Sequence, residues 1–293
     1  TWIEGFLAER GDENPRLSAQ WLVAEALNTS RIQLYADLVR PLTDAERSVL
    51  RAYTKRRAAG EPLQYITGTT DFRFITVKVR PGVLIPRPET EVLVSEALAE
   101  LKPLLDYQKV VHTVPQVQLR AIDACTGTGC IACSIASEIP WAHVIATDIS
   151  DDAVALACEN ATNLGLDARV QVESCDLLSG VPEEWHGKVD LIISNPPYIP
   201  TSVLSQIESE VTDFEPMLAL DGGSDGLDLF RALLPQVRKF LKPDGVFAVE
   251  LHEDCLEEAA NAARSVGFTK VRIALDLAQR PRVLIAHMPS DLT

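Results

Sequence analysis

The residues best suited to chemistry are Asn195-Pro196-Pro197-Tyr198, which directly follow a strand-like run at 189–194. A strand that ends this way brings a side-chain amide oxygen, a backbone carbonyl and an aromatic face together at one edge of a sheet. Neither proline has an N–H that would compete for the acceptors. A planar NH2 group matches such a site, so the segment indicates methylation of an amide or exocyclic amine nitrogen. A rigid loop after a buried strand is the alternative interpretation.

A second group of residues forms a glycine turn between a predicted strand and a predicted helix. Gly127 and Gly129 let the backbone approach a ligand closely, and the helix start that follows offers free N–H groups. Asp148 ends the next predicted strand, 19 residues after Gly129. This spacing suits a carboxylate that accepts hydrogen bonds from two ribose hydroxyls. The turn residues expected to bind a cofactor are Asp123, Cys125, Thr126, Gly127, Thr128 and Gly129.

Together the two groups indicate S-adenosyl-L-methionine as the cofactor, with S-adenosyl-L-homocysteine as the product. The glycine turn alone would equally fit a nicotinamide dehydrogenase, but no hydride-transfer signature accompanies it. Asp176 and Leu177 follow the third predicted strand and are expected to meet the adenine. An acidic residue in that place is alternatively a helix cap. Asn195 is expected to contact the cofactor as well as the substrate.

No metal is expected. Cys130 and Cys133 have the spacing of a metal or redox pair, but no second cysteine pair or histidine pair follows them. Both fall at the start of the predicted helix, where small residues packing helix against sheet explain them better. The five histidines show no ligand spacing.

The pattern of elements predicts an α/β protein with a small helical region before it. Helical spacing after Asn14-Pro15 and a capping box at 43–46 indicate helices up to about residue 68, and alternation in 71–79 indicates a strand or hairpin. Beyond residue 89, strands and helices alternate as in a doubly wound sheet. The stretch 102–118 is interpreted as a connector. Strands are expected at 119–124, 143–147, 169–173, 189–194, 245–251, 270–275 and 282–287, and helices at 90–101, 129–138, 151–163, 226–241 and 254–266.

Charge is distributed unevenly along the 293 residues, whose net charge is −15. Residues 1–90 carry 13 basic and 11 acidic side chains, whereas residues 91–293 carry 14 and 31. Duplex DNA would be repelled by such an acidic region, because its binding depends on neutralising phosphates. We therefore expect no direct DNA binding. The charge is compatible with a basic protein partner, or simply with an acidic proteome.

The composition points to a cytoplasmic protein with no membrane association. No apolar run reaches the roughly 20 residues that span a bilayer, and the N-terminus has no secretory pattern. Six cysteines in a chain of this length are typical of reduced thiols and not of a disulfide framework. An organelle matrix stays open if a transit peptide has been removed.

The chain resembles the protein-glutamine N5-methyltransferases that modify peptide chain release factors, the PrmC/HemK family. The likeness extends over about residues 15–287, and its most specific block is Ile-Pro-Arg-Pro-Glu-Thr-Glu at 85–91. Asn-Pro-Pro-Tyr is shared with adenine-N6 methyltransferases. Cys125 stands where many members have Gly, and Leu251-His252 lacks the Gly that often follows Glu there. The other similar stretches are 60–68 with Phe72, 123–129, 195–198, 214–216 and 219–220.

The resemblance implies a helical substrate-recognition domain at 1–68, a β-hairpin linker at 69–88 and a class I methyltransferase domain at 89–293. It implies that the substrate is the glutamine of the Gly-Gly-Gln motif in class 1 release factors, and we expect a monomer. Phe72 is expected to help close the site. Arg87 and Glu91 are expected to organise the junction between hairpin and core, not to take part in the chemistry.

In the expected mechanism Asn195, Pro196, Pro197 and Tyr198 are both the catalytic and the substrate-binding residues. The Asn195 side-chain oxygen and the Pro196 carbonyl accept the two N–H groups of the substrate amide, and Tyr198 packs on its plane. An adenine-N6 methyltransferase acting on DNA or RNA is the main alternative. A dehydrogenase and a non-catalytic module that only binds a release factor are the others.

Overall fold

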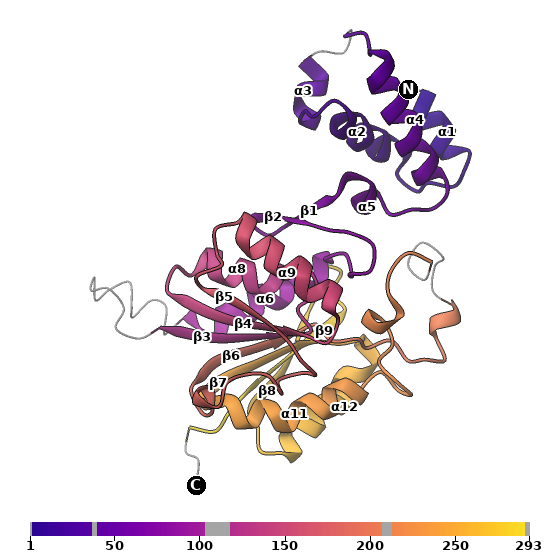
Figure 1. Cartoon of the computed structure of the whole chain (residues 1–293). Helices are drawn as coiled ribbons and strands as arrows, with labels where there is room; N and C mark the ends of the chain where they lie inside the picture. Colours follow the sequence, from indigo (N-terminus) through magenta and orange to yellow (C-terminus); the bar gives the residue numbers. More distant parts are fainter. Residues whose placement is uncertain (1, 37–39, 103–117, 207–212, 291–293) are drawn as a thin grey trace.

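The computed structural model describes residues 2–36, 40–102, 118–206 and 213–290 (Figure 1). A group of helices lies at the N-terminus, a two-stranded hairpin follows, and a seven-stranded sheet covered by helices forms the rest. The predicted connector at 102–118 lies, apart from its two end residues, outside the described residues.

The N-terminal helices pack around a small apolar core of their own. Leu7, Leu22, Leu50 and Ile66 are its buried members. The predicted capping box is confirmed: Thr43 accepts from the Glu46 N–H, and the Glu46 carboxylate accepts from the Thr43 N–H. The helices are α1 (Trp2–Ala8), α2 (Pro15–Ala26), α3 (Arg31–Ala36), α4 (Asp44–Ala58) and α5 (Leu63–Thr67).

The predicted hairpin consists of β1 (Thr69–Phe72) and β2 (Ile75–Lys78), paired antiparallel. Arg73, in its tight turn, has a positive φ of 54°. Its guanidinium forms a bidentate ion pair with Glu138, at 2.6 and 2.8 Å, and donates to the Glu91 carbonyl at 3.0 Å. Glu91 therefore does help to hold the hairpin on the core, through its backbone and not its carboxylate.

The seven-stranded sheet has the order β5-β4-β3-β6-β7-β9-β8. Strands β3 to β7 run parallel, and β9 pairs antiparallel with both β7 and β8. The doubly wound α/β prediction is confirmed, with each predicted strand present to within a few residues. The bounds are β3 (Leu119–Ala124), β4 (Ala142–Asp148), β5 (Val170–Ser174), β6 (Val189–Ser194), β7 (Leu241–Glu250), β8 (Thr269–Leu275) and β9 (Pro281–His287).

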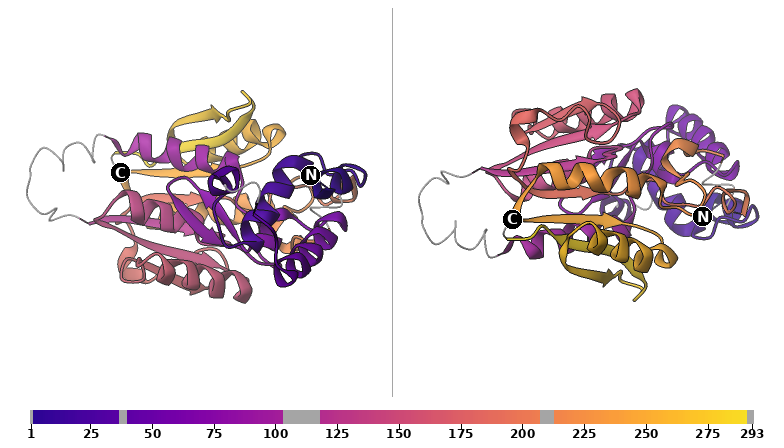
Figure 2. Two further views of the ribbon diagram at one scale, coloured as in Figure 1. Left: turned by 90° about the horizontal axis from the view of Figure 1, so that it is seen from above. Right: turned by 90° about the horizontal axis from the view of Figure 1, so that it is seen from below.

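Helices cover both faces of this sheet (Figures 1 and 2). The residues of β3 and β6 alternate between two apolar cores: Ala121 and Leu191 belong to one, and Ile122 and Ile192 to the other. Burial on both faces explains why these strands read as nearly continuous apolar runs. One face carries α6 (Pro88–Glu100), α8 (Cys130–Glu138) and α9 (Asp151–Asn163), and the other carries α11 (Asp228–Phe240) and α12 (Leu256–Ser265). Short 3-10 turns lie at Glu183–Trp185, Leu204–Gln206, Met217–Ala219 and Glu253–Cys255.

The strand order reverses beside β3, whose neighbours are β4 on one side and β6 on the other. At such a reversal the loops at the carboxyl ends diverge and leave a crevice. In the registers, Ala124 at the end of β3 lies beside both Thr147 of β4 and Ser194 of β6. The glycine turn, Asp148 and Asn195 therefore all begin at the same crevice.

Two kinds of feature are absent from the residues described. None of their helices is both long enough and apolar enough to cross a bilayer. Within the same residues, no group of three or more His, Cys, Asp and Glu side chains is arranged to hold a metal ion. Cys130 and Cys133 are buried in α8 as small core residues, which confirms the packing interpretation.

Replacing Arg73 by Met should lower the free energy of unfolding by about 3 kcal/mol, because the mostly buried Glu138 carboxylate loses its partner. The side chains of this pair are 11% and 19% exposed. The matched control is Arg231→Met, whose partners Asp225 and Glu258 are 43% and 63% exposed; that change should cost about 1 kcal/mol or less. Urea unfolding followed by circular dichroism measures both, and equal losses would contradict the anchoring role.

Candidate active site

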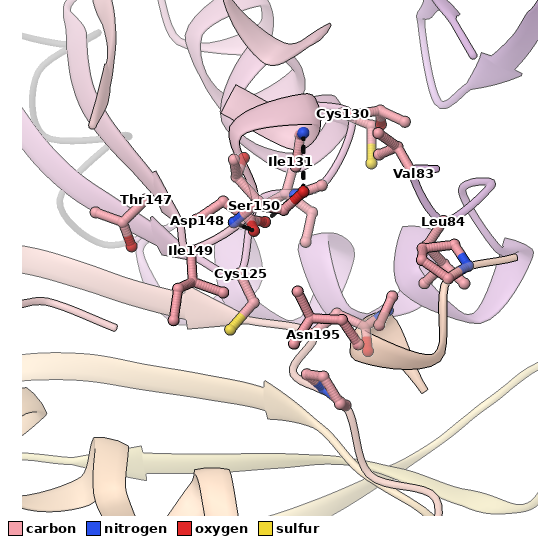
Figure 3. A pocket seen from close by; sticks show the side chains of 18 of the residues that line it. Val83, Leu84, Cys125, Cys130, Ile131, Thr147, Asp148, Ile149, Ser150 and Asn195 are labelled. Atoms are coloured by element: carbon pink, nitrogen blue, oxygen red, sulfur yellow. Dashed lines mark hydrogen bonds between the residues drawn. The ribbon is translucent and has the colours of Figure 1, made fainter. Parts of the chain in front are cut away.

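A pocket opens at the crevice and contains most of the predicted cofactor-binding residues. It is lined from β3, β4, β5 and β6 ends, from the segment before α6 and from the loop after residue 215 (Figure 3). The predicted residues that line it are Cys125, Thr126, Gly127, Thr128, Asp148, Asp176, Leu177 and Asn195, and Pro197 joins them. Sequence positions 125 to 197 are thus brought together around one cavity.

Asp148 is held in place by backbone donors on both sides. Its Oδ2 accepts from the Gly127 N–H at 2.9 Å, and its Oδ1 accepts from the Ser150 N–H at 3.0 Å. Burial raises the pKa of Asp148, while these N–H groups act in the opposite direction. Each oxygen keeps a second acceptor position. The carboxylate can therefore receive two hydroxyl groups without losing its orientation.

Two predicted cofactor contacts, Asp123 and Gly129, lie behind the pocket and do not line it. Asp123 is fully buried, and one carboxylate oxygen accepts from Thr126 Oγ1 at 2.5 Å and from the Ala132 N–H at 3.1 Å. Burial raises its pKa to about 7. At Gly129, which has a φ of 78°, a Cβ would lie 3.0 Å from the Ala157 Cβ. In this structure Asp123 ties the turn to the helix start, and Gly129 lets α8 pack against α9.

The rest of the pocket wall is mostly apolar. Leu177 and Asp176 follow β5, as predicted. Ile149 comes directly after Asp148 and is 58% exposed, and Leu229 of α11 also lines the pocket. Sequence reasoning missed Ile149 and Leu229, although an apolar residue directly after the acidic strand end was a usable signal. Cys125, in the place of a frequent Gly, adopts a positive φ of 59°.

Asn195 belongs to a hydrogen-bonded chain that the sequence patterns did not reveal. Its Nδ2 donates to Thr90 Oγ1 at 3.0 Å, and the Thr90 hydroxyl donates to Glu250 Oε2 at 2.8 Å. The Tyr198 hydroxyl donates to the other oxygen of Glu250 at 3.1 Å. Because the amide nitrogen of Asn195 is engaged by Thr90, its oxygen is left to accept from a substrate. Thr90 was visible only as part of a motif, and Glu250 only as a strand residue.

Tyr198 lies on the far side of Asn195, in a second and more polar cleft. This cleft runs between the N-terminal helices and the sheet, and its charged lining residues are Asp12, Glu13, Arg57, Arg87, Glu89, Glu215 and Arg282. Pro196, between the two openings, is buried and lines neither. The four predicted residues thus connect an apolar pocket with a polar cleft.

A glycine-rich loop packs directly on the backbone of Tyr198. The Ile199 N–H donates to the Leu220 carbonyl at 3.0 Å, and the Gly222 N–H donates to the Ile199 carbonyl at 2.8 Å. A Cβ at position 222 would lie 2.6 Å from the Tyr198 Cα, so no larger residue fits there without a shift. This close approach is a support for the site that sequence reasoning missed.

Arg87 joins two of the motifs that carried the family resemblance. Its guanidinium donates to both carboxylate oxygens of Glu215, at 2.9 and 2.8 Å, and the Glu215 side chain is 2% exposed. Nearby, the Tyr65 hydroxyl donates to the Val83 carbonyl at 2.7 Å. Arg87 therefore has an organising role, as expected, but it connects the segment before α6 to the 214–216 loop and not to the hairpin.

Phe72 does not occupy the position expected for it. Its side chain is 1% exposed in the core beneath the hairpin, and it lines neither the pocket nor the cleft. The expectation that it helps to close the site is therefore not met in this structure. The physical reason is register: Phe72 is paired with Ile75 at the hairpin turn, and both side chains point into the sheet core.

The lining residues fit S-adenosyl-L-methionine. The Asp148 carboxylate, with acceptor positions to spare, matches the ribose diol. Ile149, Leu177 and Leu229 offer apolar surface for a purine ring. A Cβ built on Gly127 would approach only Val83, at 3.9 Å, so the turn leaves open space on the pocket side.

Known proteins match this chain over nearly its whole length. A model of the PrmC N-terminal domain matches residues 1–68, and a model of a methyltransferase domain matches residues 115–277. A release factor glutamine methyltransferase from Geobacter sulfurreducens is 40% identical over 275 residues, covering 94% of this chain and 90% of that protein. The chain belongs to the release factor glutamine methyltransferase family. The same-named protein from Moorella thermoacetica is 41% identical over 282 residues, covering 96% and 94%.

Solved structures support the fold of this family member. The N-terminal domain of human METTL16, in complex with SAH, has a TM-score of 0.53 at 18% identity and covers 81% of this chain and 84% of that one. A methyltransferase from Pyrococcus furiosus has a TM-score of 0.50 at 18% identity, covering 73% and 88%. At such identities the likeness shows the class I methyltransferase fold alone.

Asp148→Asn should weaken S-adenosyl-L-methionine binding by roughly 100-fold, because a hydrogen bond to a charged acceptor contributes about 1.5–3 kcal/mol and two are affected. Titration calorimetry of the purified protein measures the Kd. The matched control is Asp152→Asn, an exposed residue in the first turn of α9, which should change the Kd less than twofold. Equal affinity for wild type and the Asp148 variant would contradict the proposed ribose contact.

Proposed function

We propose that this chain transfers a methyl group from S-adenosyl-L-methionine to the side-chain amide nitrogen of the glutamine in the Gly-Gly-Gln motif of class 1 release factors. The observation that carries the proposal is the orientation of Asn195 at the boundary between pocket and cleft, with its Nδ2 engaged by Thr90. The names of the relatives and their coverage support the same substrate. They favour it over an adenine, for which the acidic region gives no support.

The chemistry asked of the protein is mainly positioning. An amide nitrogen is a weak nucleophile because its lone pair is delocalised into the carbonyl. The Asn195 oxygen and the Pro196 carbonyl each accept one N–H of the substrate amide, which fixes the direction of the nitrogen and stabilises positive charge that develops on it. Tyr198 packs on the amide plane, and Pro197 removes a competing N–H.

The cofactor supplies an electrophilic methyl group on a sulfonium. Asp148 would hold its ribose, Asp176 and Leu177 would face its adenine, and the turn from Cys125 to Thr128 would border its remainder, as their places in the pocket suggest. No strong general base is needed while the new N–C bond forms, because the nitrogen becomes acidic only afterwards. A water-accessible acceptor can then take the proton.

The proposed division of labour has three parts. Residues 1–68 form a substrate-recognition domain, residues 69–88 a linker that includes the hairpin, and residues 89–293 the catalytic domain. The polar cleft between the first and last of these is the proposed place for the release factor loop, and its mixed charges suit a protein partner. We propose that the protein acts as a monomer in the cytoplasm, where termination of translation takes place, and binds no DNA.

Incubation of wild-type protein with S-adenosyl-L-methionine and a class 1 release factor should increase the mass of the Gly-Gly-Gln peptide by about 14 Da, one methyl replacing one hydrogen. Tandem mass spectrometry locates the change. A release factor with that glutamine replaced by alanine is the control. Transfer to adenine in an oligonucleotide, with none to the release factor, would contradict the proposal.

Asn195→Ala should lower kcat by roughly 100- to 1000-fold, the usual cost of removing one oriented polar group that stabilises developing charge. The Kd for the cofactor should change little, because Asp148 and the glycine turn remain. Turnover is measured on the release factor and the Kd by calorimetry. Near-normal kcat in the variant would contradict the role given to the amide oxygen.

A further inference from the structure

Glu250 is a buried carboxylate next to the site that the mechanism above does not use. It is the last residue of β7, and its side chain is fully buried. One oxygen accepts from the Tyr198 hydroxyl at 3.1 Å and the other from the Thr90 hydroxyl at 2.8 Å. Burial raises the pKa of Glu250 to about 7. A residue that merely filled space there would be apolar, since burying an ionisable group is costly.

The hydrogen bonds around Glu250 determine which way the Asn195 amide faces. An ionised carboxylate can only accept, so Thr90 must direct its single proton to Glu250. The Thr90 oxygen then has only lone pairs to offer Asn195, and it can pair only with the amide nitrogen, as observed at 3.0 Å. The amide oxygen is consequently presented to the substrate. The direction of each hydrogen bond from Asn195 through Thr90 to Glu250 is therefore fixed.

We propose that ionised Glu250 is a positioning residue, which acts through Thr90 to hold Asn195 with its amide oxygen toward the substrate nitrogen. This inference rests on the proposed function. Protonation of Glu250 on Oε2, the oxygen that faces Thr90, reverses the order of donors, because this O–H donates to Thr90 and the Thr90 hydroxyl then donates to the Asn195 oxygen. The Asn195 NH2 would turn toward the NH2 of the substrate, and two donors would face each other.

The charged and titratable groups around Glu250 come from three elements. Arg282 of β9 favours the ionised carboxylate, whereas Glu89 at the start of α6 opposes it. Tyr198 donates its hydroxyl from the strand-end loop. Arg282 lies 3.9 Å from Asp276, measured from Nε to Oδ2, so part of its charge is compensated. The substrate amide itself does not titrate near neutral pH, so the pH profile at saturating cofactor and substrate reports on the protein.

Activity requires the ionised form, so kcat should be lost as the pH falls through the pKa of Glu250. For wild type we expect kcat to level off above about pH 8 and to fall close to tenfold per unit well below pH 7, as for a single essential ionisation. Glu250→Gln should abolish the acid limb, because its amide does not titrate near neutral pH. The amide has one accepting and one donating end, so the order of donors next to Thr90 no longer changes with pH. The cofactor Kd should stay within about threefold, because Asp148 and the glycine turn are unchanged.

Variants of Thr90 test the same series of hydrogen bonds while Glu250 itself stays in place. Thr90→Ser keeps the hydroxyl and should retain the acid limb with kcat within about threefold. Thr90→Val is isosteric but has no hydroxyl, so it should lower kcat by at least about tenfold and flatten the profile. Asp190→Asn is the control for the general effect of neutralising a buried carboxylate. Asp190 is 3% exposed and pairs with Lys242 near the opposite end of β6; this variant should keep the acid limb.

An unchanged acid limb in Glu250→Gln, or equal kcat in the Ser and Val variants of Thr90, would overturn the inference. Loss of the limb in Asp190→Asn would overturn it too, because the limb would then not belong to Glu250. If Glu250→Gln does not fold, as judged by cofactor binding, the comparison of Thr90→Ser with Thr90→Val tests the inference instead. Failure of wild type to methylate the release factor would instead refute the proposed function, which keeps the two failures distinct.

Discussion

The parallel pairing of β3 with β4 on one side and β6 on the other is the constraint on which the site depends. It places Ala124 beside both Thr147 and Ser194, so three chain segments far apart in sequence end at one edge. Helices over both faces then bury the strands, and the diverging loops leave a crevice at this point. The positions at which the strands end therefore determine which residues line the pocket.

Polar groups at this edge are held by donors and acceptors that are themselves buried or half-buried. Asp123 fastens the glycine turn to α8, backbone N–H groups hold Asp148, and Thr90 with Glu250 holds Asn195. An unpaired polar group in such surroundings costs about 1–3 kcal/mol, so alternative orientations are disfavoured. This rigidity matters because a weak nucleophile gains most from being aimed.

The motifs outside residues 195–198 hold separate parts of the structure together. Tyr65 from the helical part donates to the Val83 carbonyl, Arg87 pairs with Glu215, and Thr90 of the same block reaches Asn195. The block at 85–91 therefore contacts the loop over the site, the Asn195 amide and the polar cleft together. Changing one member of the block therefore disturbs contacts in two parts of the structure.

Local pattern was sufficient to predict the order of strands and helices, the capping box at Thr43 and the strand-end positions of Asp148 and Asn195, because these depend on residues close in sequence. Their convergence in one pocket could be predicted from the rule that a crevice forms at the carboxyl ends of parallel strands where the strand order reverses. Pairing across the chain decided the remainder: Asp123 and Gly129 lie behind the pocket, Phe72 points into the core, and Glu250 reaches Asn195 through Thr90. Such contacts span up to 160 positions in sequence, and periodicity carries no information about partners at that distance.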